Sequence, residues 1–398
     1  GPGVTVRIKP GTYSETFSGN IPSGTDLGAN AFTMTADDPN NMPVINGGGE
    51  DVIHLYQSNH HIIFDHVIID GTNSNPQRQA IKVDGNTSIG AHHIRFSNCE
   101  IRTARGQGIL LSNGATDNEI INCNIHHNGN AHGIHGIYWA SGRGKIIGND
   151  VHHNSDYGGQ LAYEGTNGLL VEGNRWHDNG GGGLNNYSQP PNMTIINNLV
   201  YRNGSTGMDL YGSLNLKVYN NTSWGNGGSG ISYSSGLQYD ASRNISVDIR
   251  NNIANSFGII DGRNMTQSNN LFSGDPKFVN AAANDFHLTS GSPAINAGTT
   301  LSAVTKDFDG NARPVGSAYD IGAYEYGGTV SPTPSPTPLP PPATLKGDLN
   351  NDRIINSLDW SIMNSKWFTA DAAADLNSDG IVNSLDFSIM NGNWLKTI

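Results

Sequence analysis

Short runs of alternating apolar and polar residues follow one another along most of the chain, and glycine or asparagine separates them. Five runs begin with a glycine that precedes an apolar residue: 108–112, 136–140, 183–187, 207–211 and 230–234. Alternation with a period of two is typical of a strand that buries one face. The pattern predicts short strands in which the residue after each glycine points inward and the next one outward. The expected inward residues are Ile109, Ile137, Leu184, Met208 and Ile231.

A second pattern repeats between these strands. The nine residues 120–128 recur with small changes as 146–154, 171–179 and 195–203. Two registers place an asparagine, or a cysteine in the first copies, at intervals that are mostly 23–26 residues. The first register consists of Cys99, Cys123, Asn149, Asn174, Asn198, Asn221, Asn251 and Asn269. The second consists of Asn128, Asn154, Asn179, Asn203 and Asn226.

A repeat of this length fits a leucine-rich repeat or a parallel β-helix. The units lack the several leucines at fixed spacing that a leucine-rich repeat requires, and they contain short β-branched strands instead. In a parallel β-helix, equivalent residues of successive coils stack at about 4.8 Å, the strand spacing. Each asparagine then hydrogen-bonds the asparagines above and below it and satisfies buried turn backbone. We therefore expect the repeated asparagines to be structural.

Composition divides the chain into three parts. Residues 328–344 are rich in proline and threonine and carry no charge, which favours an extended spacer over a folded segment. We predict a repeat domain over 1–326, with a closing segment at about 270–326, a linker over 327–344 and a small module over 345–398.

Two matching segments of the C-terminal module carry oxygen-bearing side chains at the spacing of an EF-hand calcium loop. The side-chain ligands are expected to be Asp348, Asn350, Asp352, Asn356 and Asp359 in the first loop, and Asp375, Asn377, Asp379, Asn383 and Asp386 in the second. The backbone carbonyls of Ile354 and Ile381 would complete the two sets. The sharp turn at loop position 6 normally requires glycine. Gly380 occupies it in the second loop and Arg353 in the first, so we expect the first site to be weaker.

An apolar helix follows each loop, at 360–368 and 387–395. Duplicated loop–helix units of this kind, after a proline- and threonine-rich linker, resemble a type I dockerin, which is a small all-α module. The resemblance implies two bound calcium ions and, as partner, a cohesin module of a scaffoldin or surface protein. It also implies that loop positions 10 and 11 contact the cohesin. These positions are Ser357 and Leu358 in the first loop, and Ser384 and Leu385 in the second.

The repeat domain resembles the right-handed parallel β-helix superfamily of pectate-lyase-like proteins. The segments 275–278, 284–288, 292–295 and 320–325 are similar to the closing segment of many secreted β-helix proteins. The expected fold is an all-β, right-handed parallel β-helix, followed by the linker and the dockerin. The superfamily includes lyases, hydrolases, epimerases and non-catalytic binders. Its combination with a dockerin implies a polysaccharide-active protein that is secreted or held in an extracellular or cell-surface complex.

Composition excludes several other classes. The 51 glycines and 18 prolines indicate too many turns for a helical bundle. A net charge of −12 argues against an electrostatic nucleic-acid binder. No run of about 18 apolar residues occurs, so no membrane span is expected. Cys99 and Cys123 occupy one stacked position, where a disulfide is within reach. Parallel Cβ vectors are poor for the disulfide dihedral, and they favour two buried thiols.

Outward residues of neighbouring coils are expected to form columns. One runs through Lys82, Leu110, Tyr138, Ala162, Asn185, Asp209 and Ser232, and the next through Asp84, Ser112, Ala140, Glu164, Tyr187, Tyr211 and Ser234. Together they predict an exposed patch that suits a carbohydrate, because aromatic rings stack on sugar faces and carboxylates bind hydroxyls, calcium or protons. The expected substrate-binding residues are Tyr187, Tyr211 and Asn185. The candidate catalytic residues are Glu164, Asp209, Arg143, Tyr138 and His135, with His132, Asp156 and Tyr157 on adjoining turns.

Two reactions compete for this patch. An eliminating lyase needs a cation on the uronate carboxylate and a base for the C5 proton. The candidate bases are Arg143, Lys82, His132, His135 and Tyr138. A hydrolase needs two carboxyl groups, and Glu164 and Asp209 would lie two coils, or about 9.6 Å, apart along the axis. That separation is near the upper end of the roughly 6.5–9.5 Å range of inverting enzymes. Binding to a carbohydrate or cell surface without catalysis is the alternative.

Histidines also repeat from coil to coil. His126, His152 and His177 are expected to stack, as are His127 and His153. The histidine pairs 60–61 and 92–93 are expected to stack in the same way, nearer the start of the chain. A metal site is one interpretation of such a column, and a hydrogen-bonded histidine ladder is the interpretation that we favour.

Overall fold

The computed structural model describes residues 1–85, 90–161, 167–187, 191–235, 245–328, 346–347, 349, 355 and 357–394, except for the side chain of Leu358. The chain forms two compact units, Gly1–Pro336 and Thr337–Ile398. The division falls within the predicted linker, most of which lies outside the described residues. The limits given above for the three parts therefore stay predictions.

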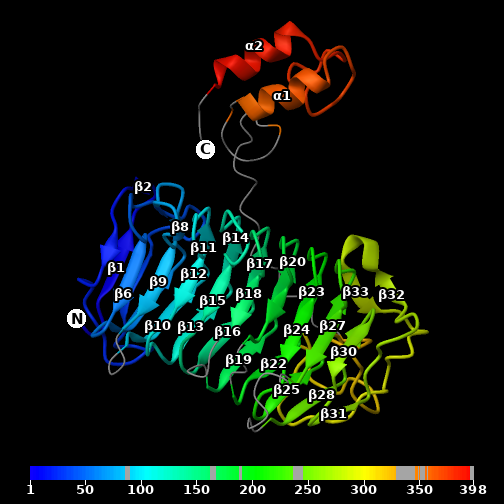
Figure 1. Cartoon of the computed structure of the whole chain (residues 1–398). Coiled ribbons are helices and arrows are strands. Elements are labelled where there is room, and N and C mark those ends of the chain that lie inside the picture. Colours follow the sequence, from blue (N-terminus) through cyan, green and yellow to red (C-terminus); the bar gives the residue numbers. More distant parts are fainter. Residues whose placement is uncertain are drawn as a thin grey trace. The chain divides into compact units, whose positions relative to one another are not determined.

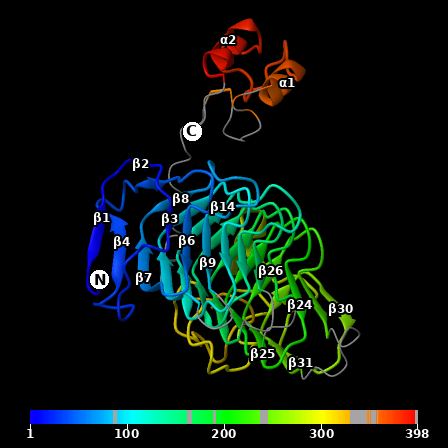
Figure 2. The same ribbon diagram turned by 60° about the vertical axis from the view of Figure 1, so that its left-hand side comes forward.

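The first unit is a solenoid of parallel strands (Figure 1). Within the described residues, these strands form three parallel sheets of 11, 10 and 10 strands, and most coils contribute one strand to each sheet. A strand pairs with the equivalent strand of the next coil, so successive repeats stack in register. Figure 2 shows the strands following one another along the axis. The all-β parallel β-helix predicted from the sequence is confirmed.

The three sheets are named A, B and C. Sheet A consists of β1 (Thr5–Ile8), β4 (Phe32–Ala36), β7 (His60–Asp65), β10 (His92–Ser97), β13 (Asn118–Ile121), β16 (Gly144–Ile147), β19 (Leu169–Glu172), β22 (Thr194–Ile196), β25 (Leu216–Tyr219), β28 (Val247–Arg250) and β31 (Met265–Ser268). Sheet B consists of β2 (Thr12–Tyr13), β5 (Val44–Ile45), β8 (Ile68–Asp70), β11 (Glu100–Arg102), β14 (Asn124–His126), β17 (Asp150–His152), β20 (Arg175–His177), β23 (Leu199–Tyr201), β26 (Thr222–Trp224) and β29 (Ile253–Ala254). Sheet C consists of β3 (Phe17–Ser18), β6 (Ile53–Tyr56), β9 (Ile81–Asp84), β12 (Ile109–Leu111), β15 (Ile137–Trp139), β18 (Gly159–Leu161), β21 (Leu184–Asn185), β24 (Met208–Tyr211), β27 (Ile231–Ser234) and β30 (Phe257–Asp261).

Asparagines turn the chain at two corners of each coil. Asn149 lies between a strand of sheet A and one of sheet B, and Asn154 follows the strand of sheet B. The Oδ1 of Asn149 accepts the Cys123 N–H of the preceding coil at 2.8 Å, and the Oδ1 of Asn154 accepts the Asn128 N–H at 3.1 Å. The same bonds recur along both columns, and nearly all of these asparagines are buried. Both predicted ladders are therefore confirmed as structural.

The first ladder departs from the prediction at its end. Its last members are Asn252 and Asn270, where the sequence analysis expects Asn251 and Asn269. Asn221 N–H donates to Asn252 Oδ1 at 2.9 Å, and Asn252 N–H donates to Asn270 Oδ1 at 2.9 Å. Asn251 and Asn269 instead take φ angles of 57° and 52°, a left-handed conformation that asparagine tolerates. In both coils two asparagines are adjacent in the sequence, at 251–252 and 269–270, so the repeat spacing alone does not show which of the two belongs to the ladder.

Apolar rows fill the interior of the solenoid. The five residues predicted to point inward from sheet C are all fully buried: Ile109, Ile137, Leu184, Met208 and Ile231. Cys99 and Cys123 are also buried, and both are free thiols. The outcome agrees with the unfavourable disulfide geometry of two stacked residues.

The predicted histidine column forms on sheet B. The rings of His126 and His152 stack with centroids 5.0 Å apart, as do those of His152 and His177. His126 Nε2 lies 3.1 Å from Glu100 Oε1, and His152 Nε2 lies 2.9 Å from Asn124 Oδ1. These bonds to neighbouring polar groups confirm the ladder interpretation for this column.

Residues 270–326 close the solenoid by packing against its coils. They contain the antiparallel strands β32 (Phe278–Asn280) and β33 (Asp285–Leu288), with the 3-10 turn η1 (Ala281–Ala283) between them. A fully buried ion pair joins Arg313 Nη1 to Glu325 Oε1 at 2.7 Å. Arg313 Nη2 also donates to Asn197 Oδ1 of a coil at 3.3 Å, which ties the segment to the solenoid.

The second unit contains two helices within its described residues, α1 (Ser357–Ser365) and α2 (Ser384–Gly392). Around them lies a small apolar core of Ile355, Met363, Ala374, Leu376, Val382 and Met390. α2 starts with a capping box, in which Asn383 Oδ1 accepts the Leu385 N–H and Asp386 accepts the Asn383 N–H. Across the parts of the chain that the structure describes, no helix is long and apolar enough to cross a membrane.

Candidate functional site

Outward residues of sheet C form the column that the alternation predicts. Strand register aligns Tyr138, Gln160, Asn185 and Asp209 on successive coils, and Ser232 follows them. Tyr138, Asn185 and Asp209 therefore lie where the sequence places them. Gln160 is a correction, because the sequence analysis expects Ala162 at this position. The only sequence signal for the outward position of Gln160 is that it is a polar residue between two residues that face inward.

Glu164 lies outside the described residues. Its expected position two coils from Asp209 depends on Ala162 pairing with Tyr138. Since Gln160 makes that pair, strand register no longer supports a separation of about 9.6 Å between the two carboxylates. A catalytic role of Glu164 stays a prediction.

Two tyrosines lie beside the column. The ring centroids of Tyr187 and Tyr211 are 6.0 Å apart, and the rings meet edge to face. Tyr187 is 49% exposed, and Tyr211 is partly buried. The pair presents apolar area together with hydroxyl groups, which suits the faces and edges of sugar rings.

His135 is almost fully buried on the turn before β15. Its Nδ1 accepts the backbone N–H of Tyr157 at 3.2 Å, and its ring also bonds the side chain of Gln160. Burial lowers the pKa of His135 to about 4, although the Asp156 carboxylate opposes this shift. His135 is therefore neutral at neutral pH. Because Nδ1 already accepts a bond, the ring donates to Gln160 through Nε2, and both nitrogens are engaged.

Asp156 is buried beside His135 and fixes the turn that carries it. Its Oδ2 accepts the Gly133 N–H at 2.6 Å and lies 3.0 Å from His132 Nδ1. The same oxygen is 3.8 Å from His135 Nδ1. A Cβ atom at Gly181 would approach Asp156 Oδ1 to 2.2 Å, so the carboxylate is tightly enclosed. These contacts assign Asp156 a structural role.

Tyr157, Asn185 and Asp209 form the polar centre of this surface. The side chain of Asn185 bonds that of Tyr157, and the charge of Asp209 acts on the same phenol. Burial and, to a smaller extent, Asp209 raise the pKa of Tyr157 to about 12. Tyr157 therefore keeps its proton at neutral pH. Asp209 Oδ1 accepts the Ser232 hydroxyl at 2.5 Å, while its Oδ2 has no hydrogen bond among the described residues.

The basic candidates are engaged outside this polar centre. Arg143 makes two bonds to Asp117, Nε to Oδ1 at 2.8 Å and Nη2 to Oδ2 at 2.9 Å. Lys82 lies on an earlier coil, where its Nζ is 2.8 Å from Asp84 Oδ2. Neither side chain contacts Tyr157, Asn185 or Asp209 within the described residues. Arg143 is thus paired with Asp117, and its role at the patch stays a prediction.

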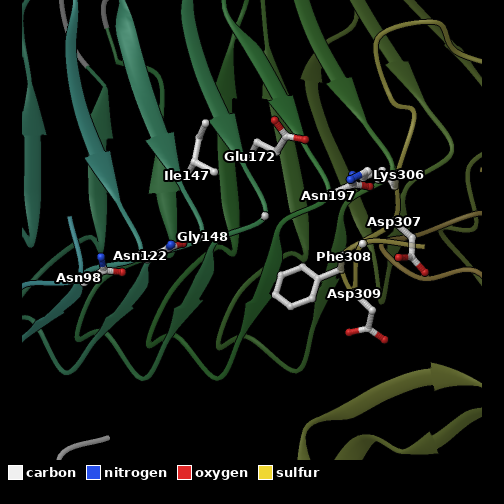
Figure 3. Close-up of a pocket in the computed structure, with 12 residues that line it drawn as sticks. Asn98, Asn122, Ile147, Gly148, Glu172, Asn197, Lys306, Asp307, Phe308 and Asp309 are labelled. Carbon is white, nitrogen blue, oxygen red and sulfur yellow. The ribbon is translucent and has the colours of Figure 1, made fainter. Parts of the chain in front are cut away.

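A separate pocket of about 400 Å³ lies where the closing segment passes the corner between sheets A and B (Figure 3). None of the described catalytic candidates lines it. Glu172 does, and burial raises its pKa. Glu172 lies in the repeated segment 171–179, where the other copies carry isoleucine, and no catalytic motif surrounds it.

The other carboxylates of this pocket are committed to the closing segment. Asp307 accepts bonds from the backbone and side chain of Asn311. Asp309 Oδ2 lies 2.8 Å from His287 Nε2, and this bond contributes most to raising the pKa of His287 to about 9. Among the described residues, Glu172 is thus the one pocket carboxylate without such a bond. One free carboxylate is too few for a hydrolysis that uses two carboxyl groups.

The second loop of the C-terminal unit is described from end to end. Asp375 accepts the N–H groups of Asp379 and Gly380 at 3.1 and 2.8 Å, and Asp386 accepts those of Asn377 and Asn383 at 3.0 and 2.8 Å. Gly380 has a φ of 93°, as the predicted sharp turn requires.

These residues fit a calcium ion. Asp386 is fully buried and has no ion pair with a basic side chain among the described residues. Burying a carboxylate without a partner is costly, and a divalent cation supplies the missing charge. The donors of the loop are oxygens, which calcium prefers. Asp375, Asn377, Asp379, Asn383, Asp386 and the carbonyl of Ile381 would hold the ion.

The first loop is only partly described. Asp348, Asn350, Asp352, Ile354 and Asn356 lie outside the described residues. Asp359 is fully buried, and its Oδ1 accepts the Leu349 N–H at 2.7 Å.

The expected cohesin contacts are at the starts of the two helices. Ser357 and Ser384 are exposed, and Leu385 is an exposed apolar residue at 58%. The side chain of Leu358 is outside the description.

Comparison with known proteins agrees with this architecture. The family profile for the right-handed β-helix region matches residues 51–189 and 135–296, and that for the dockerin type I domain matches residues 346–393. A comparison with curated protein sequences gave no significant match.

Several solved structures are similar to this chain. Pectate lyase Pel9A is 21% identical, with a TM-score of 0.55 over 81% of this chain and 88% of its own. The A-module of mannuronan C-5 epimerase AlgE4 from Azotobacter vinelandii is 15% identical, with a TM-score of 0.50 over 68% and 87%. A rhamnogalacturonan lyase is 14% identical, with a TM-score of 0.50 over 70% and 83%. At these identities the likeness shows the fold.

The coils and the calcium loop together define the class: a parallel β-helix protein with a C-terminal dockerin. More specifically, the chain belongs to the right-handed β-helix family, whose two matches together span more than half of its length, and it is pectate-lyase-like in fold. Its C-terminal unit is a type I dockerin.

Proposed function

We propose that the β-helix is an extracellular enzyme that cleaves an acidic polysaccharide along sheet C, and that its dockerin attaches it to a cohesin in a calcium-dependent manner. One observation carries the proposal. A protonated Tyr157, bonded to the buried Asn185, and the Asp209 carboxylate interact on a face that also presents Tyr187 and Tyr211. This combination offers a proton donor, a proton acceptor and a sugar-stacking surface in one place.

The chemistry of this pair favours elimination. Asp209 would take the C5 proton of a uronate, and Tyr157 would give its proton to the leaving oxygen at C4. The C5–H and C4–O bonds break, and a C4–C5 double bond forms. Hydrolysis needs two carboxyl groups at the substrate. Asp209 is one candidate, whereas Asp156 is enclosed and holds the turn before β15.

The similar solved structures support this substrate class. They include proteins named as a pectate lyase and a rhamnogalacturonan lyase. The dockerin supports the extracellular setting and the cohesin partner, with Ser357, Leu358, Ser384 and Leu385 as proposed contacts.

Binding without cleavage is the alternative function. The geometry of His135 favours it, because a ring with both nitrogens engaged is not free to take a proton from a substrate. The same tyrosines would then bind the polysaccharide without a reaction.

A polysaccharide screen separates these functions. The full-length protein in calcium should release products from a uronate-containing polysaccharide that carry both new reducing ends and the ultraviolet absorbance of an unsaturated end. Reducing ends without that absorbance would indicate hydrolysis and contradict the elimination. Binding without products, measured by calorimetry on the same polymers, would support the alternative.

Substitutions test the named pair once a substrate is found. Tyr157→Phe and Asp209→Asn should each lower kcat by about a hundredfold or more, because general acid–base catalysis contributes on that scale. Tyr187→Ala should mainly raise KM, because it removes stacking area. Tyr13→Phe, on sheet B, is the matched control and should leave both parameters unchanged. An equal loss of kcat in Tyr13→Phe, or full activity in Tyr157→Phe, would contradict the catalytic role proposed for Tyr157.

A further inference from the structure

Four histidines of sheet A form a cluster that the proposed function does not use. His60 and His61 lie at the start of β7, and His92 and His93 lie at the start of β10, one coil later. The rings of His60 and His92 stack with centroids 5.2 Å apart, and those of His61 and His93 stack at 4.6 Å. The four rings are partly exposed, so an ion in solution can reach them.

The ring nitrogens of this cluster converge. His60 Nδ1 lies 2.9 Å from His61 Nδ1, and His92 Nδ1 lies 2.8 Å from His93 Nδ1. One nitrogen each from His61, His92 and His93 lies within 4.8 Å of the other two. A contact between two imidazole nitrogens at this distance holds one proton at most, so at least one nitrogen of each pair is unprotonated.

The second histidine quartet of the solenoid behaves differently. His126 and His127 repeat the same Nδ1–Nδ1 contact, at 2.8 Å, and His152 and His153 repeat it at 2.7 Å. There, however, Nε2 of His126 and His152 is bonded to Glu100 and Asn124, which fixes those rings. Within the described residues, the first quartet has no bond from a ring to a carboxylate or amide, and it alone brings three ligand nitrogens together.

The nearest acidic groups are already engaged. Asp26 accepts the Gly28 N–H and a side-chain bond from Asn30, and Asp117 is paired with Arg143. Both act on the cluster only through their charge. The ligands available to an ion are therefore imidazoles.

We propose that His61, His92 and His93 bind one transition-metal ion, with zinc as the expected metal and His60 positioning His61. Imidazole suits zinc, copper and nickel, whereas calcium prefers oxygen. Zinc lies about 2.0–2.1 Å from a histidine nitrogen, so small ring rotations bring the three nitrogens to one ion. The ion would cross-link two adjacent coils near the start of the solenoid.

The protonation states favour this site at neutral pH. Metal ligation requires neutral imidazole. An ordinary imidazole has a pKa of about 6.5 and is mostly neutral at pH 7, so the three rings can serve as ligands there. Acidification should therefore release the ion.

Zinc titration of the full chain tests the proposal. The protein carries no histidine tag and is held in excess calcium, so that the dockerin loops are filled. Calorimetry should give one zinc ion per chain, and zinc should raise the melting temperature of the β-helix. The double variant His92→Gln/His93→Gln should bind at least tenfold more weakly, and the single variant His61→Gln should confirm the loss in case the double variant is destabilised.

The matched control is His152→Gln/His153→Gln, which removes one coil of the second quartet. It should retain the zinc stoichiometry and affinity of the natural chain. Unchanged affinity in both His61→Gln and the 92/93 variant, loss of binding in the 152/153 variant alone, or absence of binding by the natural chain would overturn the proposal. Copper, followed by its electron paramagnetic resonance, should show nitrogen ligands in the natural chain and fewer in the 92/93 variant.

Discussion

Excess EDTA should unfold the dockerin and abolish capture of the full-length protein by a cohesin, while the β-helix keeps its circular dichroism. The buried carboxylates of Asp359 and Asp386 explain the size of the effect. Both are buried in a unit whose apolar core is small, and Asp386 has no ion pair with a basic side chain among the described residues. A module of about 50 residues buries too little surface to offset that cost. Calcium binding is therefore folding free energy for this unit.

Two measurements on the intact chain can monitor the unfolding of the dockerin. Proteolysis within 346–394 should become rapid in EDTA and slow again when calcium is restored, and cohesin capture should return with it. The β-helix has its own continuous core, and its proteolysis should not change. Retention of cohesin capture in excess EDTA would contradict the calcium-loop assignment.

Substitutions separate the two loops. Asp375→Ala removes a carboxylate that accepts the N–H groups of Asp379 and Gly380, and it should weaken cohesin capture strongly. Asp348→Ala should do less, because we expect the first loop, which has Arg353 in place of glycine, to bind calcium more weakly. Asp371→Ala, just outside the second loop and paired with Lys366, is the control and should capture cohesin normally.

The coil repeat can be predicted from sequence because its physical cause is periodic. A buried asparagine such as Asn149 must meet its equivalent one coil away, and an inward residue such as Ile137 must meet another apolar side chain. Both demands recur at nearly constant spacing. The calcium loops are predictable for a similar reason, since an ion needs oxygens at fixed positions along a short loop.

The register of individual strands in sheet C is harder to predict. β18 begins with Gly159, which takes the inward position that Ile137 and Leu184 occupy on the neighbouring coils, so no apolar residue marks its start. Gln160 therefore takes the place expected for Ala162. The direction of a corner side chain is equally local. Arg143 turns to Asp117 on the preceding coil, and the pattern of polar residues does not distinguish that partner from Tyr138.

The remaining features of the candidate sites depend on contacts between neighbouring coils. Tyr157 meets Asn185, and the nitrogens of His61 converge with those of His92 and His93, only because their coils stack. The sequence predicts which residues are available for such contacts. It does not predict which nitrogens or oxygens face each other, since that depends on rotamers and loop paths.

Removing one buried member of the asparagine ladder should destabilise the β-helix severely. Asn174 is fully buried, and its Nδ2 donates to Ile146 O and Asn198 Oδ1, both at 2.9 Å. Its Oδ1 accepts the backbone and side-chain N–H groups of Asn149, both at 2.9 Å. Asn174→Ala leaves these partners buried and unpaired, at about 1–3 kcal/mol for each group that cannot find another bond. We expect the free energy of unfolding to fall by about 3–5 kcal/mol.

Asn167→Ala is the matched control for this prediction. Asn167 also accepts a bond from an asparagine of the next coil, Asn192 Nδ2 at 2.8 Å, but it is exposed and water can replace that bond. Its loss should cost less than about 1 kcal/mol. Urea unfolding in calcium, followed by circular dichroism of the β-helix, compares the two variants. Similar losses in both would mean that stacking of asparagines, and not the burial of their hydrogen bonds, stabilises the coils.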